Sequence, residues 1–147
     1  MNYIQKGEHM KDTLFKQHCP ITMHLLEQSI GKDNLMTGTP FSYTFFSTMS
    51  PQTRIEPHYG ACNIKLRCHF PIFVPPLGET FLRVGDKKTW WEEGKMLTFD
   101  DTYEHEAANL SKTDDRVVLL IDIWHPDLTL DERTSIKNMF SVVKEMV

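Results

Sequence analysis

The chain has 147 residues, of which 40% are hydrophobic, and a formal net charge of -4 at pH 7. This length fits one globular domain, residues 1–147, with a core large enough to enclose one small-molecule site. Acidic and basic residues are mixed along the chain without a basic stripe, which argues against nucleic-acid binding.

Targeting and redox signals are weak. The N-terminal residues lack an apolar signal core, and no run approaches the roughly 18 apolar residues that span a bilayer. Cys19, Cys62 and Cys68 form no CxxC pair and are odd in number, which favours reduced thiols over a disulfide scaffold. We therefore expect a cytoplasmic protein without a membrane span.

The first predicted element is a short helix in PITMHLLEQSIG, residues 20–31. Pro20 stands at its start and Gly31 just after its end, an asymmetry that is typical of helices. Short β-type runs then follow, and turn signals such as PPLGE, VGDKK and EEGK separate several of them. The runs cover residues 41–48, 63–74, 80–84, 95–99 and 116–124. Their spacing is close to that of a β-sandwich or barrel.

The last predicted element is a helix over about residues 129–146. Thr129 and Glu132 form a capping-box pair at its start. Apolar residues follow at the spacing of one helix face, namely Ile136, Met139, Phe140 and Val143. We expect this helix to pack outside the β structure, over one face or one end.

The run at residues 63–74 has two unlike faces. Its apolar residues alternate with a polar row, which consists of Asn63, Lys65, Arg67 and His69. Such a row faces solvent in many antiparallel sheets. It can also line a polar barrel interior, where basic side chains would point at an anion. Alternation alone leaves both interpretations open.

A histidine lies among acidic residues in TFDDTYEHEAANL. Neutral imidazole is a ligand for Fe, Zn, Cu or Ni, so His105 and a histidine on another strand could share one ion if the fold brings them together. A histidine beside acidic residues is also commonly a surface residue or a satisfied hydrogen-bond donor. A metal site is therefore one of two readings of this segment.

Two longer stretches carry a family resemblance. They are IEPHYGACNIKLRCHFPI and GKMLTFDDTYEHEAANLSKTDDRVVLLIDIWHPDL, and they contain HxG, RxH, FDDxxEH and R-to-DIWHP elements in order. From about Cys19 to Leu128, the chain resembles the aspartyl/asparaginyl β-hydroxylase family of Fe(II)- and 2-oxoglutarate-dependent dioxygenases. The resemblance implies a mainly β fold, a double-stranded β-helix of the jelly-roll or cupin type. Its core would cover about residues 41–128, with the helices outside.

The resemblance also implies site residues. His58 and His105 would be the catalytic histidines that bind Fe(II). Arg116 would pair with the distal carboxylate of 2-oxoglutarate, assisted by the hydroxyl of Ser47. The planar fork of an arginine suits bidentate binding of a carboxylate.

Two more positions transfer in the same way. His69 would hydrogen-bond the end of 2-oxoglutarate that chelates iron, and Arg67 would face the substrate. The implied reaction uses dioxygen and hydroxylates an unactivated carbon, by resemblance the β-carbon of an Asp or Asn residue or a related amino acid. Succinate and carbon dioxide would be released. The substrate would be a peptide, an amino acid or another small molecule, and nothing in the sequence indicates an oligomeric state.

Gly60 stands where most non-haem iron oxygenases have a carboxylate ligand, two residues after the first histidine. Hydroxylases of the resembled family likewise carry HxG, so water would fill that position. We expect iron retention that depends on 2-oxoglutarate. Two alternatives stay open: a non-catalytic cupin-like module that binds a metal or an anion, and a zinc hydrolase, which would need a third protein ligand.

Other polar and aromatic residues near the motifs are predicted to be structural. They are Asp100 with Asp101 in a turn before His105, Trp90 with Trp91 in hairpin packing, and Asp122 with His125 at the exit of the last strand. For the two neighbouring aspartates, the alternative is that they orient the ring of His105.

Overall fold

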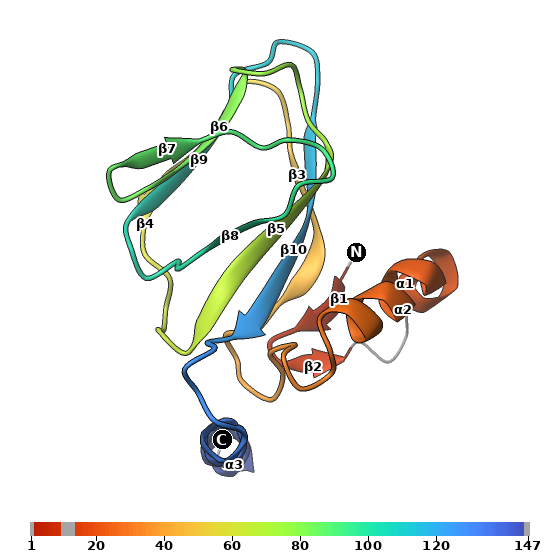
Figure 1. Ribbon diagram of the computed structural model, residues 1–147, viewed down its shortest axis with the longest axis vertical. Coiled ribbons are helices and arrows are strands. Elements are labelled where there is room, and N and C mark those ends of the chain that lie inside the picture. The colour runs from red at the N-terminus through yellow and green to blue at the C-terminus, as the bar shows by residue number, and fades with distance from the viewer. Residues whose placement is uncertain (1, 10–13, 146–147) are drawn as a thin grey trace.

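Two β-sheets face each other in the computed structural model of the chain, which describes residues 2–9 and 14–145 (Figure 1). The described elements are β1 (Asn2–Gln5), β2 (Glu8–His9), α1 (Leu14–His18), α2 (Pro20–Ser29), β3 (Thr44–Met49), β4 (Thr53–His58), β5 (Lys65–Phe73), β6 (Thr80–Val84), β7 (Lys87–Thr89), β8 (Leu97–Phe99), β9 (His105–Asn109), β10 (Arg116–Trp124) and α3 (Leu130–Glu145). One sheet has the order β2-β1-β3-β10-β5-β8, and the other has the order β4-β9-β6-β7. This arrangement confirms the predicted jelly roll.

Strand β10 lies between β3 and β5, and both pairings are antiparallel. Residues that lie opposite each other in such a pair project to the same face of the sheet. Leu119 lies opposite Phe46 and Phe70, so these three side chains share the outer face. Side chains alternate along a strand, so Val118 and Leu120 project into the space between the sheets.

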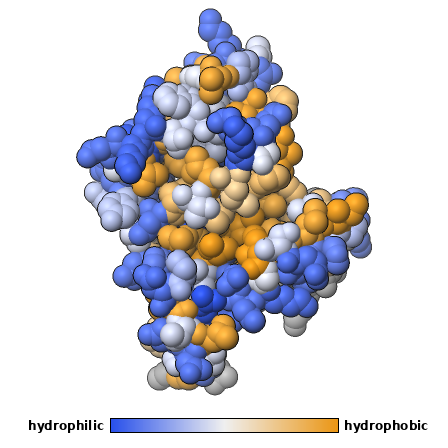
Figure 2. Space-filling view, in the orientation of Figure 1, coloured by the Kyte–Doolittle hydropathy of each residue, from blue (hydrophilic) through white to orange (hydrophobic). Residues whose placement is uncertain are grey.

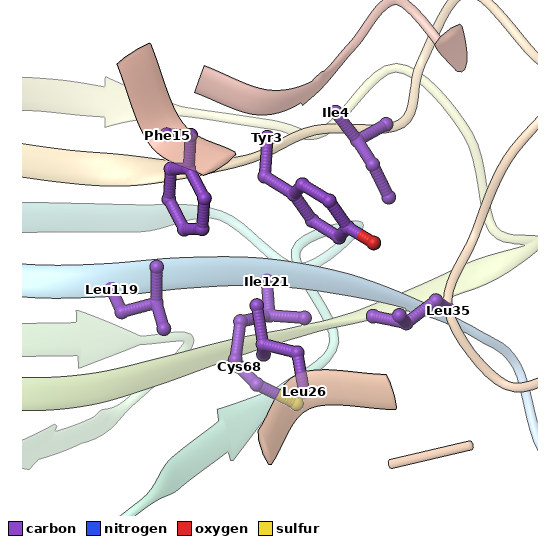
Figure 3. Packing of buried hydrophobic residues seen from close by; sticks show 8 residues of the cluster. All are labelled: Tyr3, Ile4, Phe15, Leu26, Leu35, Cys68, Leu119 and Ile121. Atoms are coloured by element: carbon purple, nitrogen blue, oxygen red, sulfur yellow. The ribbon is translucent and has the colours of Figure 1, made fainter. Parts of the chain in front are cut away.

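The outer face of the first sheet carries an apolar core, which Figure 3 shows from close by. Strand β1 and helices α1 and α2 supply half of it, the segment between α2 and β3 supplies Leu35, and β5 and β10 supply the rest. The buried members are Tyr3, Ile4, Phe15, Leu26, Leu35, Cys68, Leu119 and Ile121. The ring of Phe15 stacks on Tyr3 at 5.3 Å and on Phe46 at 5.5 Å. Each such buried side chain stabilises the fold by about 1.5–3 kcal/mol.

A second apolar cluster joins the two sheets from inside. Met49 and Val118 come from the first sheet, and Leu82 and Ala107 come from the second. The ring of Trp91, in the segment between β7 and β8, completes this cluster and is 2% exposed. The jelly roll is therefore closed by side chains at this end of its interior.

Helix α3 lies outside the sheets, below the end of β10 in Figure 1. Its predicted capping box is present, since the Thr129 backbone N–H donates to Glu132 Oε2 at 2.8 Å and the Glu132 N–H donates to Thr129 Oγ1 at 3.3 Å. Phe140 packs edge-on against Phe41 at 5.6 Å. Met139 is 55% exposed, so the predicted apolar stripe is only partly covered. The predicted end at residue 146 and the side chain of Val143 lie outside the described residues.

The predicted strand runs agree well with the longer strands. Residues 80–84 and 116–124 form β6 and β10 with the predicted bounds, and the predicted helix ends at Ser29. Strands β1, β2, β4, β7 and β9 and helix α1 were not predicted. Strand β4 has the sequence TRIEPH and is mostly exposed, and β9 contains two alanines in HEAAN. Neither shows the β-branched and aromatic pattern that marks a strand in sequence.

The face drawn in Figure 2 gathers hydrophobic residues over the region where β5, β8 and β10 lie in Figure 1. Phe70 and Ile72 on β5 are 36% and 45% exposed, and Met96, just before β8, is 47% exposed. Among the helices of the described residues, none combines the length and the apolar character needed to cross a membrane.

Candidate active site

Two histidines meet between paired strands of the second sheet. His58 ends β4 and His105 begins β9, and the two residues are register partners. Their ring centroids lie 4.1 Å apart. The structure therefore brings together His58 and His105, the two histidines that the family resemblance implies as metal ligands, although they are far apart in the chain.

Backbone carbonyls fix the orientation of both rings. His58 Nδ1 lies 2.8 Å from the carbonyl oxygen of Glu56, and His105 Nδ1 lies 2.9 Å from that of Tyr103. A carbonyl only accepts hydrogen bonds, so Nδ1 must carry the proton in each ring. This leaves the lone pair on Nε2 of both rings, the arrangement usual for metal-binding histidines.

The two rings differ in burial. His105 is 5% exposed, whereas His58 is exposed. Burial, with a further contribution from neighbouring His58, lowers the pKa of His105 below its ordinary value, which favours the neutral form that binds metals. Among the described residues, no three His, Cys, Asp or Glu side chains form a metal-binding group.

Gly60 packs against the carboxylate of Asp101. A Cβ atom added at Gly60 would lie 2.5 Å from Cγ and Oδ1 of Asp101, which is far closer than real contacts allow. The Gly60 N–H also donates to the backbone oxygen of Asp101 at 2.6 Å. The glycine is therefore required by its neighbour, because Asp101 fills the space that a side chain at position 60 would need.

The two neighbouring aspartates have different roles. Asp100 Oδ1 accepts from the N–H and the hydroxyl of Thr102 at 2.9 and 2.6 Å, so the predicted turn role is confirmed there. For Asp101 that prediction is wrong. Its carboxylate is buried and forms an ion pair with Lys65, because the turn directs it inward against Gly60.

A cluster of four charged side chains lies on the inner face of β5 and β10. Lys65 Nζ contacts Asp101 Oδ2 at 2.5 Å and Asp122 Oδ1 at 3.2 Å. Arg67 donates to Asp122 through Nε at 2.9 Å and Nη2 at 3.1 Å. Lys65, Asp101 and Asp122 are each at most 2% exposed. The polar row of β5 thus faces the interior. Asp122 pairs with both Lys65 and Arg67, as expected for a structural residue.

A second polar group on the same face holds unpaired donors. Arg116 is 2% exposed, and its Nε and Nη1 have no hydrogen-bond partner among the described residues. His69 is 8% exposed, and its Nε2 is likewise without a partner there. Burial lowers the pKa of Arg116 to about 10, so it stays cationic at neutral pH. This group has a positive charge and open donors, which suits an anion.

Trp91 links the two members of this group. Its Nε1 donates to His69 Nδ1 at 3.2 Å, and the Arg116 guanidinium carbon lies 4.7 Å from the centre of its ring. Ser47 lies opposite Val118 on β3, so it shares the face of Arg116. Trp91 is packed as predicted, but its contacts were missed. The sequence does not indicate which interior residues a tryptophan in an irregular segment between two strands will contact.

A cavity of about 350 Å³ opens beside the charged cluster. Its lining residues are Asn2, Tyr43, Phe45 and Arg67. The side chain of Arg67 is 21% exposed, in contrast to the buried Lys65. Arg67 is therefore the member of the cluster that a bound molecule can reach.

His125 follows directly after the end of β10. Its backbone N–H donates a hydrogen bond to the carbonyl oxygen of Ile64, as expected if this residue has a structural role where the chain leaves the sheet.

Comparison with known proteins supports one family. Residues 3–126 match the family described as Aspartyl/Asparaginyl beta-hydroxylase. The chain is 34% identical to the "Aspartyl/asparaginyl beta-hydroxylase" of Mus musculus, covering 92% of this chain and 19% of that protein. It is 36% identical to the Mus musculus "Aspartate beta-hydroxylase domain-containing protein 2", covering 84% of this chain and 35% of that protein. The chain thus spans about a fifth to a third of the length of these relatives.

Two cupin domain structures are among the solved structures that match the chain in shape. A cupin domain from Bordetella pertussis Tohama I has a TM-score of 0.43 and 18% identity, covering 56% of this chain and 80% of that one. A Cupin 2 conserved barrel domain protein from Salinispora arenicola CNS-205 has a TM-score of 0.44 and 9% identity, covering 65% of this chain and 71% of that one. The match over residues 3–126 decides the assignment: the chain belongs to the aspartyl/asparaginyl β-hydroxylase family.

Proposed function

We propose that the chain is an Fe(II)- and 2-oxoglutarate-dependent dioxygenase that hydroxylates an unactivated carbon. The favoured position is the β-carbon of an Asp or Asn residue or of a related amino acid, with release of succinate and carbon dioxide. Family membership and the names of the relatives support this reaction class. The residues of the interior support the cosubstrate and the metal.

The unpaired guanidinium of Arg116 carries the proposal. An ion buried without a partner costs several kcal/mol, so a buried cation with two open donors calls for an anion. A carboxylate matches the planar fork of the arginine. Arg116 would hold the distal carboxylate of 2-oxoglutarate with the help of Ser47. His69 would donate from Nε2 to the other end of the molecule.

The histidine pair fits a ferrous ion. His58 and His105 would hold it through Nε2, since Nδ1 of each ring is bonded to a backbone carbonyl. The carboxylate of Asp101, packed against Gly60, places negative charge close to the position where other such sites have a third ligand. When bound, the ion together with 2-oxoglutarate would supply oxygen activation, and the chain itself would orient the reactants and exclude water.

The cavity beside Arg67 is the proposed substrate position. Tyr43 and Phe45 offer aromatic walls, and Asn2 offers an amide. Arg67 donates to Asp122 through Nε and Nη2, and its Nη1 lies 3.5 Å from Asp101 Oδ2. The second hydrogens of Nη1 and Nη2 are therefore the donors that it can extend to a substrate oxygen. A peptide, an amino acid or another small molecule with an acid or amide group would suit this lining.

Turnover of 2-oxoglutarate to succinate tests the proposal. With Fe(II) and oxygen supplied, we expect succinate to form only when both are present. Arg116→Gln should raise the 2-oxoglutarate concentration needed for half-maximal turnover by about 100-fold, because a buried charge pair is lost. Arg54→Gln is the matched control, since Arg54 is exposed on β4. Binding of 2-oxoglutarate without any succinate would replace this proposal with a non-catalytic anion-binding module.

A further inference from the structure

The buried ring of Trp91 contacts both His69 and Arg116, two interior residues with open hydrogen-bond donors. It lies between β7 and β8, outside every strand. Its Nε1 donates to Nδ1 of His69 at 3.2 Å, and its ring face lies 4.7 Å from the guanidinium carbon of Arg116. One side chain therefore contacts two of the three described residues that have unsatisfied buried side-chain nitrogens, the third being Trp124.

The hydrogen bond from Trp91 determines which nitrogen of His69 carries the proton. An indole N–H can only donate, so Nδ1 of His69 must accept with its lone pair. The proton of the neutral ring then lies on Nε2. A doubly protonated ring would set one N–H against another at 3.2 Å. The contact thus selects one tautomer and disfavours the cation.

The surroundings of His69 act in the same direction. Its ring is 8% exposed and lies edge-on to Phe99 at 5.2 Å. Burial, followed by the charges of Arg116 and Arg67 and by His105, lowers the pKa of His69 to about 3. The ring is therefore neutral at any working pH, and Nε2–H is a fixed donor without a charge.

The same indole restrains Arg116. A guanidinium over the face of a tryptophan is held by cation–π attraction and by stacking. Strand β10 fixes the start of the side chain at Arg116, and Trp91 fixes its charged end. Nε and Nη1 remain without protein partners among the described residues, so the restrained fork keeps its donors for a ligand.

We propose that Trp91 is a positioning residue that keeps His69 as a neutral Nε2–H donor and holds the guanidinium of Arg116. The two side chains then donate hydrogen bonds to the two ends of one bound ligand. The ligand class is a molecule with a carboxylate for Arg116 and a further oxygen acceptor for His69. Naming 2-oxoglutarate as that ligand rests on the proposed function, whereas the tautomer of His69 does not.

The test combines nitrogen NMR of the histidine rings with binding of 2-oxoglutarate to the metal-free protein. In the unmutated chain at pH 7, His69 should show a protonated Nε2 and an unprotonated Nδ1. Trp91→Phe keeps an aromatic ring but removes the N–H, so His69 should then show a mixture of tautomers. Affinity for 2-oxoglutarate should fall about tenfold, the usual effect of losing one hydrogen bond and part of a cation–π contact.

Trp90→Phe is the matched control. Trp90 is the adjacent residue and is 43% exposed, so its replacement should leave the His69 tautomer and the affinity unchanged. Trp91→Tyr is a second variant that keeps a ring and lacks the indole N–H, and it replaces Trp91→Phe if that chain does not fold.

Different failures have different signatures. A proton on Nδ1 of His69 in the unmutated chain, or a doubly protonated ring at pH 7, overturns the inference about Trp91 whatever the ligand is. An unchanged tautomer in both Trp91 variants overturns it as well. If the tautomer behaves as expected but the unmutated chain binds 2-oxoglutarate neither in its metal-free form nor with Fe(II) under anaerobic conditions, the proposed function fails and the role of Trp91 toward His69 stands.

Discussion

Two polar clusters lie on the inner face of β5 and β10, and they differ in how their charges are satisfied. Lys65 and Arg67 face Asp101 and Asp122, so two cations meet two carboxylates. Arg116 and His69 lie on the same two strands but have no carboxylate partner among the described residues. The four basic side chains share two strands and one face, and the difference comes from the carboxylates: of these four, Asp122 on β10 and Asp101 from the turn between β8 and β9 reach only Lys65 and Arg67.

This comparison separates structure from function in physical terms. A buried ion pair that is complete needs no ligand, and removing one member leaves an uncompensated charge. A buried cation with open donors is costly until an anion arrives. The paired cluster should therefore matter for stability, and the unpaired group should matter for binding. The predictions below test each half of that statement.

Lys65→Met should have the largest effect on stability. It removes a cation that contacts both Asp101 and Asp122, and it leaves their charges buried. We expect the free energy of unfolding to fall by about 3–5 kcal/mol. Urea unfolding of the metal-free protein measures this change. A loss below about 1 kcal/mol would show that the two carboxylates do not depend on Lys65.

Arg116→Met should behave in the opposite way. No hydrogen-bond partner among the described residues is lost and an unpaired buried charge is removed, so the free energy of unfolding should not fall and should rise by about 1–4 kcal/mol. The unmutated protein should gain about 2.7 kcal/mol when 2-oxoglutarate is present at 100 times its dissociation constant, and the variant should gain nothing at that concentration. Thermal unfolding with and without 2-oxoglutarate reads out both values. A variant as unstable as Lys65→Met would make Arg116 a structural residue.

Gly60→Ala should have an intermediate effect. The new Cβ would lie 2.5 Å from the carboxylate of Asp101, so one of the two residues must shift. Overpacking of this kind costs about 1–3 kcal/mol. Because Asp101→Ala removes the carboxylate, the double variant should be less destabilised than the two single changes added together. Additive costs in urea unfolding would mean that the clash is not the reason for the glycine.

The stability of the folded protein should also depend on pH in a graded way. The pKa of His69 is lowered from 6.5 to about 3 in the folded protein, so between these values the unfolded chain binds a proton that the folded chain does not. The free energy of unfolding should then fall as pH falls from 6.5 towards 3, by about 1.4 kcal/mol per pH unit from this group. His69→Gln should lack this component, and parallel pH profiles would contradict it.

Much of the fold could be predicted from the sequence. The apolar strand β10 and the short strand β6 have a clear pattern, and the capping box marks the start of α3. Strands β4 and β9 were missed because their residues are exposed or small, although they carry His58 and His105. Those two histidines were found only through motifs of a family, since their pairing depends on strand register.

The arrangement of side chains in the interior was harder to predict from the sequence. Alternation along β5 gives two faces but does not say which one is inside, because helices that cover the outer face come from a distant part of the chain. Asp101 was expected to share the turn of Asp100, yet the turn directs it inward to Lys65. Trp91, between β7 and β8, donates a hydrogen bond to His69 on β5. No local sequence pattern predicts this contact.

The most direct test of the central claim is an anaerobic titration of the metal-free protein with Fe(II) and 2-oxoglutarate. The complex of iron with chelated 2-oxoglutarate has a weak visible charge-transfer band. We predict that the band forms only with both components, that His105→Ala abolishes it, and that Arg116→Met shifts its formation to much higher 2-oxoglutarate concentrations. A folded, unmutated protein that gives no band, or a band that persists in His105→Ala, would contradict the account.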